Sequence, residues 1–194
     1  MNRSLVLEHF SASLLIEQLQ QLAESENLWR IRTIAKGGTV FGPETDCRDV
    51  FLLITGLVKL SYLAPSGGET IKSLVVDQGM FGREDNGPDF GAYAIEASQL
   101  VQLPQIWVSK QVSESPKLQQ GYALFLDWIR GRKAEREQRL LCFTPQERLI
   151  DFRKAEPDLI NRLPEGDIAR YLGVTPIAYS RIKRRLDPIT VAKL

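Results

Sequence analysis

The side chains best suited to chemistry in this chain are a group of donors between residues 176 and 186. A helix over this range would expose Ser180, Arg181, Lys183, Arg184 and Arg185. Guanidinium and ammonium groups bind phosphate oxygens, and a guanidinium can also donate two hydrogen bonds to the edge of a guanine. The group therefore has the chemistry of a surface that binds a polyanion; a solvated basic face is the alternative.

Two short helices joined at a glycine are predicted to position this group. Ala169 is the small residue that a close helix crossing needs, and Gly173 can adopt the positive φ that ends the first helix. Thr175 is a good N-cap, and Pro176 then occupies the first helical position. This combination predicts a helix-turn-helix that places its second helix in the major groove of duplex DNA. The apolar residues spaced to bury the shared face are Ile168, Leu172, Val174, Tyr179 and Ile182.

Length, composition and charge describe an ordinary globular chain with an uneven charge distribution. The 194 residues are enough for one large domain or two small ones, and 43% are apolar and 25% charged. From Thr144 onward there are 10 Lys/Arg and 7 Asp/Glu, whereas the first 143 residues carry a net charge of −2. An acidic front and a basic tail suit a sensor attached to a module that binds a polyanion.

Residues that could hold a cofactor or perform catalysis are scarce. Cys47 and Cys142 form no CxxC motif, and His9 is the only histidine, so we expect no zinc, iron–sulfur or haem group. No Ser/His/Asp or Cys/His set suggests an enzyme. The longest apolar run, residues 50–58, is too short to cross a bilayer, and no signal-peptide core is present. We therefore expect a cytoplasmic protein with no membrane partner and no cofactor.

Short apolar segments separated by glycine turns occupy residues 28–104. Before them, the spacing of leucines predicts a helix near 13–25. The segments themselves predict strands at 29–34, 39–41, 50–54, 57–62, 70–76, 92–95 and 99–104. Gly56 is expected to be a hinge between two strands, and the last two strands are expected to pair as a hairpin. Strands of this length and spacing are typical of a β sandwich or roll.

A long helix is predicted over residues 118–143. Leu118, Tyr122, Phe125 and Ile129 follow a four-three-four spacing, which favours a seam between two copies of the chain. The alternative is that this stripe packs on the chain's own roll. Thr144 followed by proline marks the start of another helix, which is expected to end before residue 157.

Several short motifs occur in order along the chain: ITGLV at 54–58, GET at 68–70, QGMFG at 78–82, DIA at 167–169 and LGVT at 172–175, followed by Ser180-Arg181. With these motifs and this order of elements, the chain resembles the catabolite activator protein/FNR superfamily of bacterial transcription regulators. The resemblance implies an α+β chain with an N-terminal double-stranded β-helix, or jelly roll, of the cyclic-nucleotide-binding type. That sensor would span residues 1–115, a dimerisation helix 116–143 and a helix-turn-helix domain 144–194.

Residues 81–93 depart from the pattern of the nucleotide-binding members. There a Phe-Gly-Glu segment is followed by an Arg-Ser or Arg-Thr pair that holds the cyclic phosphate. Here Phe81-Gly82 leads into Arg83-Glu84, and Phe90-Gly91 stands where the pair would be. We expect that neither cyclic AMP nor cyclic GMP binds tightly, with Arg83 as a substitute clamp the alternative. A different small effector, a protein contact or no effector remain open. The pocket candidates are Gly82, Arg83, Glu84, Gly91, Ala92 and Tyr93.

The predicted reader also departs from the family. Ile177 stands where the family has a base-reading glutamate, and an isoleucine could contact a thymine methyl. Arg181 is the best candidate for guanine, with a phosphate contact as the alternative. Only eight residues follow Leu186, so we expect a reader without a full wing. The candidate DNA-contacting residues are Thr175, Ile177, Ser180, Arg181, Lys183, Arg184 and Arg185.

These expectations converge on a dimeric, sequence-specific DNA-binding transcription regulator. Its implied partners are a palindromic duplex operator and a second copy of the chain, with RNA polymerase as a further candidate. The alternative is a degenerate sensor that serves protein interaction without binding DNA, which the isoleucine at 177 and the missing wing would suit.

Overall fold

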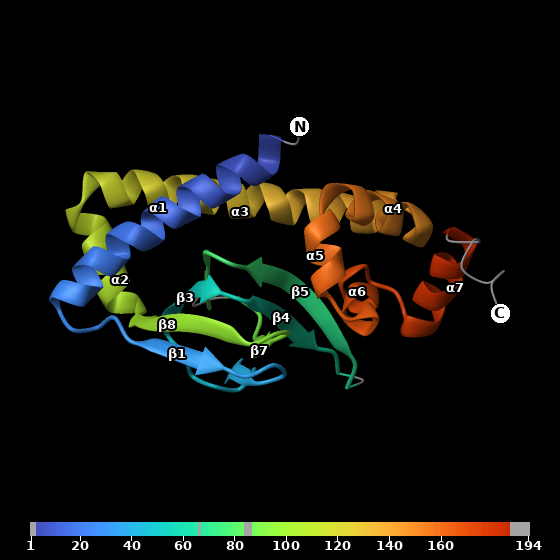
Figure 1. Cartoon of the computed structure of the whole chain (residues 1–194), viewed down its shortest axis with the longest axis horizontal. Helices are drawn as coiled ribbons and strands as arrows, with labels where there is room; N and C mark the ends of the chain where they lie inside the picture. Colours follow the sequence, from blue (N-terminus) through green and yellow to red (C-terminus); the bar gives the residue numbers. More distant parts are fainter. Residues whose placement is uncertain (1–2, 66, 84–86, 187–194) are drawn as a thin grey trace.

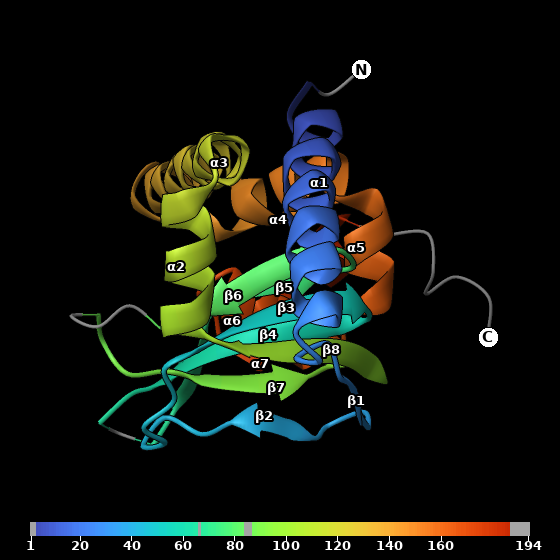
Figure 2. The same ribbon diagram turned by 90° about the vertical axis from the view of Figure 1, so that its left-hand side faces the viewer.

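The computed structural model describes residues 3–65, 67–83 and 87–186, and the side chains from residue 13 onward. A β roll lies beneath two long helices, α1 (Arg3–Ser25) and α3 (Pro116–Cys142), and a group of short helices closes one end (Figure 1). Turned by 90°, the molecule shows α1 and α3 above the sheets with α2 (Gln105–Glu114) standing beside them (Figure 2). None of the helices described is long and apolar enough to span a membrane.

The roll consists of two four-stranded antiparallel sheets, as the alternating segments predicted. The first sheet has the order β1-β8-β3-β6 and the second has the order β2-β7-β4-β5. The strands of the first sheet are β1 (Ile31–Ile34), β8 (Ser98–Pro104), β3 (Asp49–Thr55) and β6 (Gly79–Gly82). Those of the second are β2 (Thr39–Phe41), β7 (Gly91–Ala94), β4 (Leu57–Leu63) and β5 (Glu69–Val76). The fold class predicted from the sequence is therefore confirmed.

Gly56 connects the two sheets, as expected of a hinge. It joins β3 to β4 with a φ of +117°, and a Cβ at this position would overlap Ser98. Only glycine combines this backbone conformation with so close a neighbour. The chain therefore turns here from the first sheet into the second without a loop.

The predicted hairpin of strands 92–95 and 99–104 is wrong. β7 pairs with β2 and β4, whereas β8 pairs with β1 and β3 in the other sheet. The intervening residues cross from one sheet to the other, and alternation along a strand does not reveal which strand becomes its partner. The strands predicted from the sequence also did not include β6, which pairs with β3.

The apolar stripe of α3 packs within its own chain. Leu118 is 1% exposed and Phe125 is 4% exposed, and both lie in a core cluster with Leu15 and Leu19 of α1. Tyr122 and Ile129, partly buried, pack against the same cluster. The alternative considered for this stripe, packing on the chain's own roll, describes part of these contacts, because Leu52 and Val101 of the roll lie in the same cluster as the α1 residues. A seam between two copies would therefore need another face of the helix.

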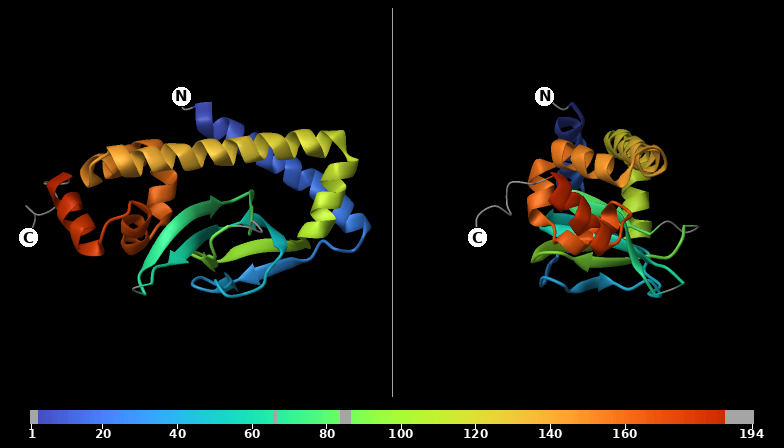
Figure 3. Two further views of the ribbon diagram at one scale, coloured as in Figure 1. Left: turned by 180° about the vertical axis from the view of Figure 1, so that it is seen from behind. Right: turned by 90° about the vertical axis from the view of Figure 1, so that its right-hand side faces the viewer.

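Four short helices follow α3: α4 (Pro145–Ala155), α5 (Pro157–Arg162), α6 (Glu165–Tyr171) and α7 (Pro176–Leu186). The predicted start of α4 is confirmed, because Thr144 and Glu147 form a reciprocal capping box with Pro145 at the first helical position. Helix α5 was not predicted, since its short sequence carries no clear periodicity. From behind and from the end, α6 and α7 are seen to close the same end of the roll (Figure 3).

Candidate nucleic-acid interface and sensor roll

Helices α6 and α7 form the helix-turn-helix that the sequence predicted. Gly173 has a φ of +68°, and its N–H donates to the Arg170 carbonyl at 3.3 Å while the Val174 N–H donates to the Ala169 carbonyl at 3.0 Å. The Thr175 hydroxyl accepts from the Ala178 N–H at 3.2 Å and caps α7. These bonds satisfy the groups that helix ends leave free, so the turn is determined by its own few residues.

One side of α7 is buried and the other faces solvent. Tyr179 is buried, whereas Ile177 is 69% exposed and Arg181 is exposed. Lys183 forms an ion pair with Glu165 of α6, so its ammonium group already has a partner within the helix-turn-helix. The remaining candidates also lie on α7 or at its start: Thr175, Arg184 and Arg185 are exposed and Ser180 is partly buried. The structure thus brings the seven candidates together on one short helix and its cap.

Ion pairs clamp α6 onto the second sheet of the roll. Lys59 on β4 places its ammonium 2.8 Å from a Glu69 carboxylate oxygen and 3.1 Å from an Asp167 oxygen. Arg170 adds contacts to Asp167 at 3.1 Å and to Glu69 at 3.4 Å. Burial alone would raise the pKa of Glu69, but the hydrogen bond from Lys59 and the charge of Arg170 outweigh it and lower that pKa. The helix-turn-helix is therefore tied to the roll by charges that lie far apart in the sequence.

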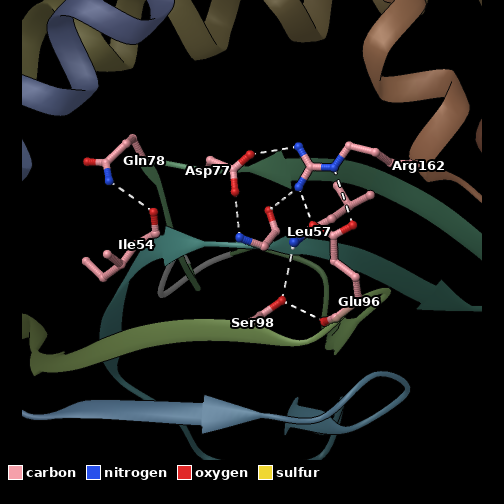
Figure 4. A network of polar contacts seen from close by, with 8 residues as sticks. Ile54, Leu57, Asp77, Gln78, Glu96, Ser98 and Arg162 are labelled. Carbon is pink, nitrogen blue, oxygen red and sulfur yellow. Dashed lines mark hydrogen bonds and ion pairs between the residues drawn. The ribbon is translucent and has the colours of Figure 1, made fainter.

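A second connection centres on Arg162 at the end of α5 (Figure 4). Its guanidinium pairs with Glu96 and with Asp77, the latter at 2.7 Å, and donates to the Gly56 carbonyl at 3.0 Å. The Asp77 carboxylate also accepts from the Gly56 N–H at 2.6 Å. Burial would raise the pKa of Asp77, but the bonds from Arg162 and Gly56 outweigh it and lower that pKa. The bond to Glu96 is the main cause of the raised pKa of Arg162. We call these four residues the Arg162 latch.

The latch and the Lys59 clamp were missed by sequence reasoning. The pairs that join the C-terminal helices to the roll are separated by 66 to 108 positions in the chain, and isolated charged residues carry no signal of pairing at that distance. The quoted motifs contain three members of these groups, Gly56, Glu69 and Asp167, but none of the motifs indicated an ion pair.

Arg83 of the predicted ligand pocket is enclosed by backbone carbonyls. Its guanidinium donates to the carbonyls of Gly42 and Pro43 at 2.6 Å and to those of Thr45 and Phe90 at 2.7 Å. An exposed carboxylate, Asp89, lies 3.4 Å away. The side chain that could have replaced the phosphate clamp is thus engaged in holding two loops together.

Aromatic side chains fill the interior of the roll beside Arg83. Phe41, Phe51, Phe81 and Phe90 are all buried, and their ring centroids lie 5.2 to 6.3 Å apart in four contacting pairs. The Arg83 guanidinium lies 5.2 Å from the Phe41 ring centroid and 5.8 Å from that of Phe90. Side chains therefore occupy the space between the sheets near this end.

The other pocket candidates do not share one cavity. Ala92 is buried in the aromatic cluster, and Gly82 pairs with Val50, leaving no room for a side chain against the Asp49 carbonyl. Gly91 is buried next to Phe90, a partner of Arg83.

Tyr93 instead lines a cavity of about 290 Å³ between the outer face of the second sheet and α6. Glu84 lies outside the described residues.

Comparison with known proteins places this arrangement in a class. No family model matches the chain. The global nitrogen regulator of Synechococcus elongatus is 25% identical over 190 residues, covering 87% of this chain and 83% of the relative. The solved structure of FixK2 from Bradyrhizobium japonicum superposes with a TM-score of 0.68 at 20% identity, covering 82% of this chain and 84% of FixK2. A crp/fnr-family protein from Eubacterium rectale gives 0.69 at 15% identity, with 85% and 81% covered.

These comparisons and the motif order agree. The resemblance to the catabolite activator protein/FNR superfamily is confirmed: the chain has the fold of these regulators, with a cyclic-nucleotide-binding-like roll, a long connecting helix and a helix-turn-helix.

Proposed function

We propose that the protein is a cytoplasmic, dimeric transcription regulator that binds a palindromic duplex through α7. The observation that carries this proposal is the exposed basic surface of α7 on an intact helix-turn-helix, with Arg181 and Ile177 projecting from it. An arginine at this place can donate two hydrogen bonds to guanine, and an exposed isoleucine can pack on a thymine methyl. Arg184 and Arg185 supply charge for flanking phosphates.

A selection experiment tests directly whether the protein binds a specific duplex sequence. Full-length protein is incubated with random duplexes, and the enriched sequences are recovered and used to compare Arg181→Ala with the wild type in mobility shifts. A palindrome is expected, and the Arg181 variant should lose about 1–3 kcal/mol of binding free energy and its preference at one base position. Lys110→Ala is the matched control, because Lys110 is an exposed cation on α2 at the far end of the molecule.

Failure has a clear form. If no duplex sequence is enriched, the protein is not a sequence-specific reader, and the protein-interaction module becomes the better hypothesis. If a palindrome is enriched but Arg181→Ala binds it normally, the assignment of Arg181 is wrong while the function stands.

Dimerisation is part of the proposal, and the structure suggests which surface serves it. At about 100° per residue, Leu124, which is 56% exposed, lies about 20° from Gly131 around α3 and at least about 100° from Leu118 and Phe125. Gly131 has open space where a Cβ would be, so a second helix could approach closely beside Leu124. To bind successive major grooves, such a seam would have to hold the two α7 helices about 34 Å apart.

Sedimentation of Leu124→Arg tests that seam. A charge placed in an apolar contact between copies should convert a wild-type dimer into monomer and weaken operator binding with it. Leu126→Arg, on the same helix but another face, is the control. A wild type that remains monomeric at working concentrations would contradict the dimer.

The proposal includes a sensor that does not bind cyclic AMP or cyclic GMP in the usual way. It is supported by the aromatic filling of the roll and by the enclosure of Arg83 among carbonyls. A cyclic phosphate would have to displace these contacts without the Arg-Ser donors that other members offer it.

A further inference from the structure

A small cavity at the joint between α3, α4 and α6 is lined by four arginines. Arg132, Arg136 and Arg139 project from the end of α3, and Arg148 projects from α4. The carboxylates of Asp151 and Glu156 also line the cavity. This joint lies outside the roll, where members of the superfamily would hold a nucleotide, and none of its residues belongs to the reader surface on α7.

Positive charge exceeds negative charge in this lining. Arg132 pairs with Glu156 at 2.7 Å and Arg139 pairs with Asp151 at 2.7 Å, so each carboxylate already has a cation. Arg139 also lies 3.6 Å from Glu135 outside the cavity. Arg136 and Arg148 face the same space, and the lining offers no further carboxylate to them. The excess of two guanidinium groups favours a bound anion.

Two buried donors in this lining have no acceptor. The Nε atoms of Arg136 and Arg148 are buried and lack a hydrogen-bond partner among the described residues. The other end of Arg136 is fixed, because its Nη2 donates to the Ile71 carbonyl at 2.7 Å and to the Tyr171 carbonyl at 3.1 Å. Burial lowers the pKa of Arg136, which shows that its charge is desolvated without full compensation. An unpaired buried donor is costly, so an acceptor in the cavity would be stabilising.

The size of the cavity restricts what could supply that acceptor. Its volume is about 40 Å³. A single water needs about 10–15 Å³ on the same measure, so there is space for a tetrahedral oxyanion and none for a nucleotide. Guanidinium groups bind such ions through forked, charge-assisted hydrogen bonds.

The cavity also touches the turn of the helix-turn-helix. A Cβ on Gly173 would lie 3.3 Å from Nη1 of Arg148 and 3.2 Å from a methyl group of Leu140, and Tyr171 and Leu172 of the same segment line the space. An ion held by Arg136 and Arg148 would therefore connect the long helix, α4 and the start of the reader at one point.

We propose that this joint is a binding site for a small oxyanion, inorganic phosphate or an ion of the same shape and charge such as sulfate. Binding stabilises the packing of α4 and α6 against α3 and so restrains the orientation of α7. Because a ligand that binds only the folded protein raises its stability by mass action, occupation of the site is measurable without DNA.

The test is thermal unfolding of the full-length protein in inorganic phosphate, with ionic strength held constant by sodium chloride. We expect the midpoint to rise with the logarithm of the phosphate concentration once this exceeds the dissociation constant, which should be on the order of 1 mM or lower. Excluded salts raise the midpoint roughly in proportion to their concentration, so this curvature distinguishes binding from that general effect. Sulfate should replace phosphate, and chloride should not. Calorimetric titration checks the stoichiometry of one ion per chain.

Matched variants locate the site. Arg148→Gln should weaken phosphate binding at least fivefold. Arg130→Gln, which removes the same charge from an exposed position of α3 beside Asp127, should leave it unchanged. Should Arg148→Gln fail to fold, Arg139→Gln replaces it, because the freed Asp151 carboxylate would then repel the anion.

Two results would overturn the proposal: a wild-type midpoint that follows phosphate no differently from chloride, or equal phosphate affinity in the Arg148 and Arg130 variants. The second result would mean adventitious surface binding. Phosphate binding here together with failure to enrich any duplex would instead leave this site standing and remove the proposed DNA-binding function.

Discussion

The interior of the roll and the surface of α7 place the same residue type in opposite surroundings. Arg83 lies among four backbone carbonyls and beside aromatic rings, whereas Arg184 and Arg185 extend into solvent. The first guanidinium donates from both of its terminal nitrogens to protein carbonyls, and among the described residues only its Nε lacks an acceptor. The other two guanidinium groups retain their donors for a partner. The available acceptors, rather than the residue type, therefore separate an arginine that stabilises the fold from one that can recognise a ligand.

The largest effect that would test this contrast is on stability. Arg83→Met removes the donors of four carbonyls and should lower the free energy of unfolding by about 2–4 kcal/mol. Arg184→Met, at an exposed position, should change it by less than about 0.5 kcal/mol. Chemical denaturation measures both. If the Arg83 variant were as stable as the wild type, Arg83 could not be called an arginine that stabilises the fold.

The Arg162 latch provides an intermediate case, because its guanidinium is partly exposed and yet pairs α5 with the roll. With 29% of the side chain exposed, solvent screens part of the interaction, so Arg162→Gln should cost about 1–2 kcal/mol. Denaturation of this variant is compared with that of Arg130→Gln, whose ion pair is on the surface. Equal losses in the two would show that the latch contributes no more than a surface pair.

Acid should weaken the same connections by a smaller, graded amount. The pKa values of Asp77 and Glu69 are lowered in the folded protein, so their contribution is complete above the ordinary carboxyl pKa near 4. It is lost as the pH falls through the lowered values. Stability measured from pH 6 down to pH 3 should therefore decline below about pH 4, and Asp77→Asn should decline less steeply. If the stability of Asp77→Asn fell with pH as steeply as that of the wild type, Asp77 would be excluded as a cause of the acid sensitivity.

The last prediction is that cyclic nucleotides have no measurable effect. Calorimetric titration with cyclic AMP and with cyclic GMP should give no saturable heat at micromolar concentrations, since the roll offers filled space and an engaged Arg83. A dissociation constant in the micromolar range for either nucleotide would mean that the aromatic cluster opens, and that the enclosure of Arg83 is not maintained in solution.

Local signals were sufficient for the reader. Gly173, Thr175 and Pro176 predicted a turn, a cap and a first helical residue, and the bonds observed there join residues within five positions of one another. Alternation likewise located most strands of the roll. The predicted pairing of the strands was partly wrong, because β7 and β8 are adjacent in sequence and alternate alike but belong to different sheets.

The stripe on α3 shows the same limit. A spacing of apolar residues identifies a buried face without naming what buries it, and here α1 and the roll do so. The exposed side that bears Leu124 was not distinguishable until the buried face had been assigned. The lining of the arginine cavity comes from α3, α4 and the α5–α6 region, so no local pattern marks it either.

Helix ends, strand positions and the order of the elements follow from preferences that each residue expresses with its immediate neighbours, and for that reason they can be recognised in the chain as written. The partners of Lys59, Arg83 and Arg162 follow from which surfaces come together across many tens of residues. Coulombic and hydrogen-bonding energies depend on those distances and on burial, so only the folded molecule determined which charges hold the roll together, which join it to the C-terminal helices and which remain available to a ligand.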